Sequence, residues 1–319
     1  MDAGLLYQNA KIKSKESELF TRDKMQRLSD AATAEEALRI LQENGYPAGT
    51  DPVEVLAAAE REATLFYKSA VVSGYGLELF LLPLDYHNAK VLAKKAYFLG
   101  NADCLGPDGL TEAKVIEESL EKEDFSQLPA CMTDAFRAIR KKSADESLTP
   151  SYIDVALDKA LFAAIQAGLP DAHAVVKEYF VRLSDLTNIT VACRAKKAGI
   201  SASAFAEMTV AAGEISSSDI RKIFELGAEE AAEKLTLPAV YKDALRAMKE
   251  GTAHFETYVD DTLLAPIRKA RYDMFSPAAI VGFYLGKLRE IKNVRLILAK
   301  INNGVDREVI KVRTRELYV

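Results

Sequence analysis

Apolar residues recur at intervals of three and four along most of the chain, which is the spacing of amphipathic α-helices. The two longest stripes are Val176, Tyr179, Phe180, Leu183 and Leu186, and Val281, Tyr284, Leu285, Leu288, Ile291 and Val294. No sustained alternation of apolar and polar residues is bounded by Asn-Gly or Asp-Gly turns, so strands are expected to be minor at most. The pattern predicts an all-α protein.

Glycine and proline interrupt the helical pattern at YPAGTDP (46–52), LGPDG (105–109) and SLTPS (147–151). In each interruption a Thr or Asp precedes the next apolar stretch, where its side chain can cap the following helix. These segments are therefore predicted to be loops between helices.

The segment LDYHNAK, which begins at Leu84, places an acid and an Asn three residues apart inside an otherwise apolar stretch. The same order of aromatic and aliphatic residues, acid, two residues, Asn and a later Gly recurs over residues 79–100, 178–200 and 283–305. The repeated pairs are Asp85 with Asn88, Asp185 with Asn188, and Glu290 with Asn293. Upstream of each pair, an acid precedes a Leu by three positions, at Glu62, Asp158 and Asp260.

The repeated acid–Asn pair and the repeated upstream acid occur in the same order each time. Together they predict three homologous helical units, over residues 1–108, 109–204 and 205–319. At 319 residues, length alone favours about two domains, and the repeat replaces that expectation. We expect the three units to be arranged with pseudo-threefold symmetry.

An acid and an Asn three residues apart lie on one helical face. One interpretation is metal ligation, but Asn is a poor ligand without several carboxylates beside it, and His87 is the one histidine close to a copy of the motif. The preferred interpretation is that each pair satisfies buried polar groups where one helical hairpin meets the next. The sequence therefore predicts structural polar pairs and no metal site.

Composition and charge narrow the function classes. A formal charge of −5 and a pI near 5.5 argue against nucleic acid as the main partner, although RAKKAG (194–199) and KVRTR (311–315) are local basic stretches. Three cysteines without CxxC spacing are typical of reduced thiols in a cytosolic protein. The apolar runs are far shorter than the roughly 20 residues that cross a bilayer, so no membrane insertion is expected.

Motifs for nucleotides and catalysis are also missing. GFYLGKL (282–288) resembles a phosphate-binding loop, but it has three residues between its glycines instead of four and Leu288 in place of Ser or Thr. GYG (74–76) lacks the third glycine and the preceding strand of a dinucleotide site. With no HExxH or GxSxG sequence either, we expect no cofactor, no bound nucleotide and no catalytic residue.

Four stretches together resemble a known family. They are LYQNAKIKSKESELF near the N-terminus, EEALRILQENGY (35–46), LFLLPLDYHNAKVL, and the ending EIKNVRLILAKINNGVDREVIKVR. The chain is similar over its whole length to the C subunits of bacterial and archaeal V/A-type rotary ATPases, the counterparts of the d subunit in eukaryotic V-ATPases. DYHN and the ExKNxRxI ending are the most specific parts, whereas Leu186 and Thr187 between the acid and Asn of the middle repeat match less well.

The resemblance implies a funnel-shaped helical protein without catalytic activity. It would lie in the cytoplasm, peripheral to the membrane, and join the central axle, formed by the D and F subunits, to the membrane proteolipid ring. Two other interpretations stay open: a soluble all-α enzyme with a magnesium or calcium site at the repeated acids, and a helical-repeat scaffold of an unrelated complex.

Overall fold

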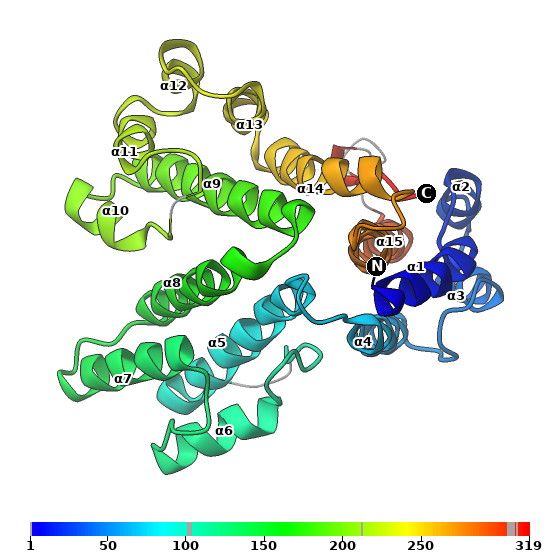
Figure 1. Cartoon of the computed structure of the whole chain (residues 1–319), viewed down its shortest axis with the longest axis horizontal. Helices are drawn as coiled ribbons and strands as arrows, with labels where there is room; N and C mark the ends of the chain where they lie inside the picture. Colours follow the sequence, from blue (N-terminus) through cyan, green and yellow to red (C-terminus); the bar gives the residue numbers. More distant parts are fainter. Residues whose placement is uncertain (1, 101–103, 212, 305–309, 311) are drawn as a thin grey trace. The chain divides into compact units, whose positions relative to one another are not determined.

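The computed structural model describes residues 2–100, 104–211, 213–304, 310 and 312–319, and these residues contain helices and no strand (Figure 1). The all-α prediction is confirmed. The chain divides into two compact units. The first contains Met1–Tyr75, His173–Tyr179 and Ala228–Val319, and the second contains Gly76–Ala172 and Phe180–Gly227. This division does not test the predicted boundaries at 108/109 and 204/205, so the three pseudo-symmetric units stay a prediction.

The first unit contains nine helical segments of the described chain. They are α1 (Ala3–Lys15), α2 (Arg22–Ser29), α3 (Ala34–Glu43), α4 (Pro52–Ala70), the first residues of α9 (Ala174–Lys197), α12 (Ala228–Lys234), α13 (Ala239–Glu250), α14 (Thr252–Ala270) and α15 (Ala278–Asn303). A short 3₁₀ turn, Glu16–Glu18, follows α1.

The core of the first unit joins helices from the two ends of the chain. Helix α15 packs against α4 and also contacts α1, α2 and α3. Its residues Ile291, Val294, Ile297 and Leu298 form one buried cluster with side chains of α2, α3 and α4. The apolar stripe predicted from Val281 to Val294 is therefore the inner face of α15, and burial of such a face supplies most of the stability of a helix in a protein.

The second unit contains α5 (Leu82–Phe98), α6 (Ala113–Lys122), α7 (Ala130–Ala144), α8 (Pro150–Gly168), the rest of α9, α10 (Ala202–Met208) and α11 (Ser217–Leu226). Two 3₁₀ turns, Leu77–Phe80 and Leu169–Asp171, complete it. Helices α5 and α8 lie side by side, as do α7 and α8 (Figure 1). Their apolar faces form one cluster around Tyr86, Phe136 and Leu157.

The three predicted loops separate helices as expected. Asp51 accepts a hydrogen bond from the Val53 N–H at the start of α4, and Thr149 accepts one from the Tyr152 N–H at the start of α8. In the middle loop, Asp108 accepts from the Ala113 N–H, where α6 begins. Part of the basic C-terminal segment, including Lys311, lies outside the described residues.

Candidate functional site

The first polar pair lies on α5 and binds the stretch that leads into α6. Asp85 accepts hydrogen bonds from the N–H groups of Leu110 and Thr111, both at 3.0 Å. Asn88 accepts from the Gly106 N–H at 2.8 Å and donates to the carbonyl oxygens of Gly106 and Pro107 at 3.4 and 3.3 Å. Both side chains are buried, so the pair satisfies backbone groups that would otherwise lack partners.

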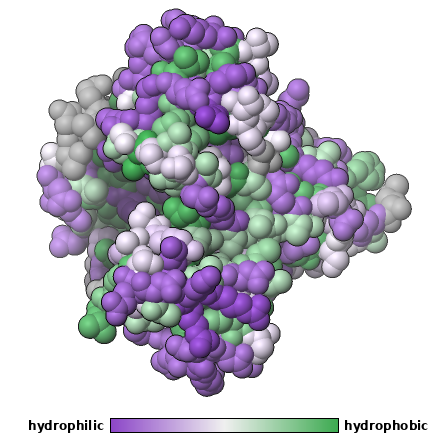
Figure 2. All heavy atoms as spheres, turned by 90° about the vertical axis from the view of Figure 1, so that its left-hand side faces the viewer, coloured by the Kyte–Doolittle hydropathy of each residue, from purple (hydrophilic) through white to green (hydrophobic). Residues whose placement is uncertain are grey.

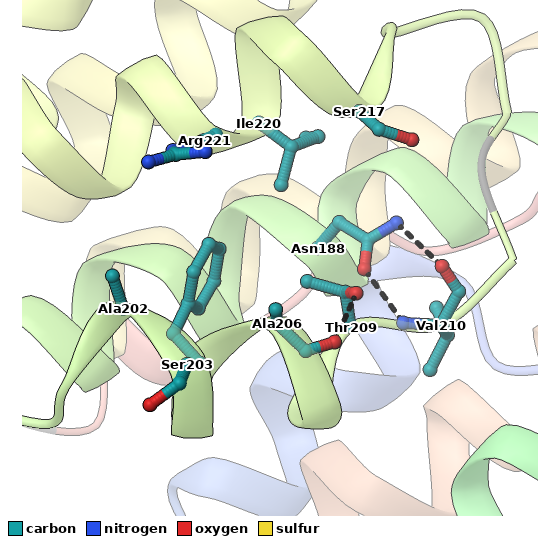
Figure 3. Close-up of a pocket in the computed structure, with 10 residues that line it drawn as sticks. Asn188, Ala202, Ser203, Ala206, Thr209, Val210, Ser217, Ile220 and Arg221 are labelled. Carbon is teal, nitrogen blue, oxygen red and sulfur yellow. Dashed lines mark hydrogen bonds between the residues drawn. The ribbon is translucent and has the colours of Figure 1, made fainter.

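The second polar pair, on α9, binds the stretch that leads into α11. Asp185 accepts from three successive N–H groups, those of Gly213, Glu214 and Ile215, at 3.1, 2.8 and 3.2 Å. Asn188 accepts from the Val210 N–H at 2.9 Å and donates to the Val210 carbonyl oxygen at 3.2 Å (Figure 3). The Asn side chain thus pairs with one peptide unit in the same way as a neighbouring backbone would.

The third polar pair, on α15, binds two stretches that are far apart in sequence. Glu290 accepts from the Phe20 N–H at 2.7 Å, just before α2, and from the Tyr46 hydroxyl at 2.8 Å. Asn293 accepts from the Arg315 N–H and donates to the Arg315 carbonyl oxygen, both at 3.0 Å.

The three pairs therefore make the same kinds of contact. Each Asn binds the backbone 18 to 22 positions later, and each acid accepts hydrogen bonds from N–H groups immediately before a short helix, α6, α11 or α2. We call the stretches bound by these pairs the docked segments: residues 104–112, residues 209–211 with 213–216, and residues 312–319 together with Leu19 and Phe20.

Two glycines let the first two docked segments approach their helices. A Cβ atom at Gly109 would lie 2.4 Å from both an Asp85 carboxylate oxygen and the Leu81 carbonyl oxygen. A Cβ atom at Gly213 would lie 2.4 Å from the Val181 carbonyl oxygen and 2.7 Å from the Asp185 carboxylate. Real Cβ atoms do not come so close, so only glycine fits at these positions.

The third docked segment uses an aromatic ring instead. The buried Tyr318 side chain lies against Gly282 and Gly286 of α15. An added Cβ atom at Gly282 would come within 2.4 Å of the ring, and one at Gly286 within 2.6 Å of the Tyr318 Cβ atom. These are the glycines of GFYLGKL, so their spacing forms a notch for a ring inside a helix. In GYG, Gly76 has a φ of 73°, and a Cβ atom there would lie 2.5 Å from the Cβ atom of Ala172. The backbone conformation and this close approach explain the glycine, and no bound nucleotide is needed to explain it.

A buried cation also fastens the third docked segment. Arg289 donates to the Asp261 carboxylate at 3.0 Å, to the Glu316 carbonyl oxygen at 3.4 Å and to the Asp260 carbonyl oxygen. Arg315 donates to the Asp260 carboxylate at 2.9 Å. Burial opposes ionisation of Asp260, but Lys292, Arg315 and Arg289 outweigh it and lower the pKa of this carboxyl group.

Ion pairs also account for another of the upstream acids. Asp158 on α8 accepts a hydrogen bond of 2.5 Å from Lys90 on α5 and so ties these two helices together.

Burial, followed by the charge of Glu290, raises the pKa of Tyr46, so this phenol stays protonated and donates to Glu290.

Together these contacts form an internal fastening, which means that they hold loops of the chain against its long helices. The carboxylates direct their oxygens at backbone N–H groups, and each pair binds a different docked segment. Within the described residues, no group of three or more His, Cys, Asp or Glu side chains is placed to hold a metal ion. A cavity of about 410 Å³ lies beside Asn188, lined by Phe205, Ile220 and Arg221 among others, but the Asn188 amide is already bonded to Val210 (Figure 3).

The sequence did not reveal Gly109, Gly213, Tyr318 or Arg289 as contributors to this site. Each acts on a partner more than 20 residues away, or through burial, and single-sequence periodicity reports neither. Gly109 lies in the stretch LGPDG, which the sequence marked only as a loop.

Comparison with known proteins decides the family. A sequence model of the ATP synthase (C/AC39) subunit matches residues 8–313, which is nearly the whole chain. The chain belongs to this family. Among its relatives, the C subunit of the V-type sodium ATPase of Enterococcus hirae is 24% identical, with 97% of this chain and 98% of the relative covered. The C subunit of the A-type ATP synthase of a Desulfurococcus species is 25% identical, with 96% and 89% covered, and that of Methanocaldococcus jannaschii is 23% identical, with 95% and 84% covered.

The resemblance inferred from the sequence is thereby confirmed at the level of the family. In the part of the chain that the structure describes, no helix is both long enough and apolar enough to cross a bilayer.

Proposed function

We propose that this chain is the non-catalytic central-stalk subunit of a V/A-type ATPase or ATP synthase that translocates protons or sodium ions. It joins the axle, formed by the D and F subunits, to the membrane proteolipid ring and transmits torque between them. It lies in the cytoplasm, peripheral to the membrane. The observation that carries the proposal is the family match over residues 8–313, together with relatives that are named as C subunits and align over most of their length.

The internal fastening supports a mechanical role. A coupling must carry torque without yielding, and the polar pairs anchor the loops before α2, α6 and α11 to long helices through buried hydrogen bonds. Such bonds are costly to leave unmade, so the loops are held in one position. On the face shown in Figure 2, hydrophilic residues predominate and hydrophobic residues form smaller patches between them. This suits polar and separable contacts better than a large apolar interface.

The decisive experiment is reconstitution of the rotary complex with and without this chain, with ATP hydrolysis and ion pumping both measured. Without the chain, the soluble head should still hydrolyse ATP but pumping should stop. Binding to the axle should also weaken as salt rises, because the Debye length is about 10 Å at 0.1 M. Persistent pumping, or failure to bridge axle and ring, would favour a scaffold of an unrelated complex.

Absence of catalysis is part of the proposal. The two glycine motifs that resemble nucleotide loops have structural explanations in the Tyr318 notch and the approach to Ala172. Calorimetry of the isolated chain with magnesium and ATP should therefore show no binding heat. A dissociation constant of about 1 μM or below would refute this part.

A further inference from the structure

Helix α1 has apolar side chains on both of its faces. Leu5 and Ile12 are buried on the side that packs against α15. On the opposite side Leu6 is half-buried, and Tyr7 and Ala10 are exposed, Tyr7 to 68%. The outer face of a surface helix is ordinarily polar, and here Leu6, Tyr7 and Ala10 make part of this face apolar beside the exposed Ser14.

Lysines border this outer face on both sides. Residues Ala3–Lys15 contain Lys11, Lys13 and Lys15 and no acid. On one edge the ammonium groups of Lys11 and Lys15 lie 4.9 and 5.7 Å from the centre of the Phe66 ring on α4. On the other edge the Lys13 ammonium lies 4.7 Å from the centre of the Tyr272 ring.

The loop between α14 and α15 extends the same surface. Asn9 donates to the carbonyl oxygens of Met274 and Ser276 at 2.9 and 3.0 Å, which holds this loop against α1. Between these anchors Phe275 is 61% exposed, and Tyr272 is 70% exposed. Arg271 lies 4.8 Å from the centre of the Tyr272 ring and adds another cation.

We infer that this surface, the outer face of α1 with Tyr272, Phe275 and Arg271, docks on the headgroups of anionic phospholipids. Lysine and arginine next to a bilayer are attracted by its negative surface potential. Tyrosine and phenylalanine beside them favour the headgroup level, where an amphipathic ring meets both water and acyl chains. The contact is with the membrane surface and needs no spanning helix.

The acidic residues around this surface are compatible with such docking. Glu16 and Glu18 follow α1 and pair with Lys13 and Lys15 at 2.7 and 2.8 Å. Asp273 is bonded to the Phe275 N–H. The Lys15–Glu18 pair is exposed and therefore weak, so Lys15 can exchange this partner for a lipid phosphate, whereas the Lys13–Glu16 pair is partly buried.

Apolar and aromatic groups flanked by cations fit a lipid surface, which offers phosphates to the cations and the headgroup region to the rings. The inference relies on the proposed function only for bringing the chain close to a membrane. It goes beyond that function, because coupling through axle and ring requires no lipid contact.

The test is co-sedimentation of the full-length chain with vesicles of phosphatidylcholine containing about 30% phosphatidylglycerol, and with pure phosphatidylcholine. Binding should require the anionic lipid. In the variant Lys11→Gln/Lys13→Gln/Lys15→Gln, the partition coefficient should fall at least about tenfold, since each cation near the surface contributes about fivefold.

A matched control tests whether the loss of vesicle binding comes from the change in net charge alone. The variant Lys114→Gln/Arg137→Gln/Lys141→Gln removes three exposed cations from α6 and α7 and should bind like the parent. A second variant, Tyr7→Ser/Tyr272→Ser, changes no charge and should lower binding about threefold to tenfold. Circular dichroism checks that each variant is folded.

Three results would overturn the inference: no binding to anionic vesicles, equal loss in the control, or normal vesicle binding by the lysine variant together with its failure to join the complex in detergent. The last would make the surface a protein contact. Vesicle binding uses the isolated chain, so a chain that binds vesicles normally but does not couple would count against the proposed function alone.

Discussion

Asp185 and Asn188 bind a stretch of chain that continues directly into α11, whereas Glu290 and Asn293 bind two stretches from opposite ends of the chain. In the first case the covalent chain keeps the docked segment close, and three N–H bonds with a glycine contact suffice. In the second case Leu19 and Phe20 continue into α2, and residues 312–319 are held by additional contacts, a ring in a glycine notch and partly buried ion pairs.

The difference also explains the residue types. A glutamate replaces the aspartate on α15, and its longer side chain reaches both Phe20 and the Tyr46 hydroxyl. A site that binds two stretches far apart in sequence orders more of the chain than a site that binds one stretch, so more contacts are needed to hold it.

The largest loss of stability is expected at the glycines of the first two docked segments. Changing Gly109→Ala should lower the free energy of unfolding by about 3 kcal/mol, because the new methyl group would displace Asp85 from its N–H partners. Urea denaturation measures it. Gly106→Ala is the matched control in the same segment, where a Cβ would lie 3.5 Å from the His87 ring, and should stay within about 0.5 kcal/mol of the parent. Equal effects would mean that the close approach at Gly109 is unimportant.

The asparagines test whether the three pairs are energetically alike. Each of Asn88→Leu, Asn188→Leu and Asn293→Leu should cost about 1–3 kcal/mol, because a buried peptide unit loses its partners. Asn293→Leu should be the mildest, since Arg315 is also held by Asp260. Chemical denaturation of single and double variants should show nearly additive losses and unchanged helix content. Variants as stable as the parent would show that these bonds are dispensable.

Tyr318→Ala sharpens the contrast between the two kinds of attachment. It should cost only about 1–2 kcal/mol, less than the 3–5 typical of an interior aromatic, because residues 314–319 lie outside the helices and can detach locally. Hydrogen exchange of the Glu316 amide, which donates to Asp261, should accelerate. Tyr318→Phe keeps the ring in the notch and should leave exchange near that of the parent. Fast exchange in both variants would assign the attachment to the hydroxyl group.

The smallest expected effect is a pH dependence confined to the third docked segment. The lowered pKa of Asp260 gives stability that is present above about pH 4, the unfolded value, and is lost as the pH falls through the folded value. Asp260→Asn should therefore cost about 1 kcal/mol at pH 7 and less at pH 3.

Asp261 gives the opposite sign and serves as the control. Burial raises its pKa, so its ionisation opposes folding once the pH rises above the unfolded value. The cost of Asp261→Asn should accordingly be larger at pH 3 than at pH 7. Parallel pH profiles for the two variants would contradict the assignment.

The sequence was sufficient for the helical class, the long stripes of α9 and α15, and the loops at 46–52 and 147–151, because all depend on neighbours within one or two turns. It also located Asp85, Asn88 and their counterparts as unusual polar residues. Their partners were out of reach, since the Glu290 contact with Phe20 spans 270 positions. The Gly282 and Gly286 spacing was visible, but it has meaning only beside Tyr318, which lies in a different segment.

The sharing of one cluster by α15 and α2–α4 has a consequence for synthesis of the chain. Ile291 is made about 230 residues after Ala59, so at 5–20 residues per second the apolar faces of α2–α4 wait roughly 12–50 s for their covering helix. Helices α5–α8, whose cluster closes with Ala160, can pack well before then. The core around α5–α8 can therefore be completed before the core that contains the N-terminal helices.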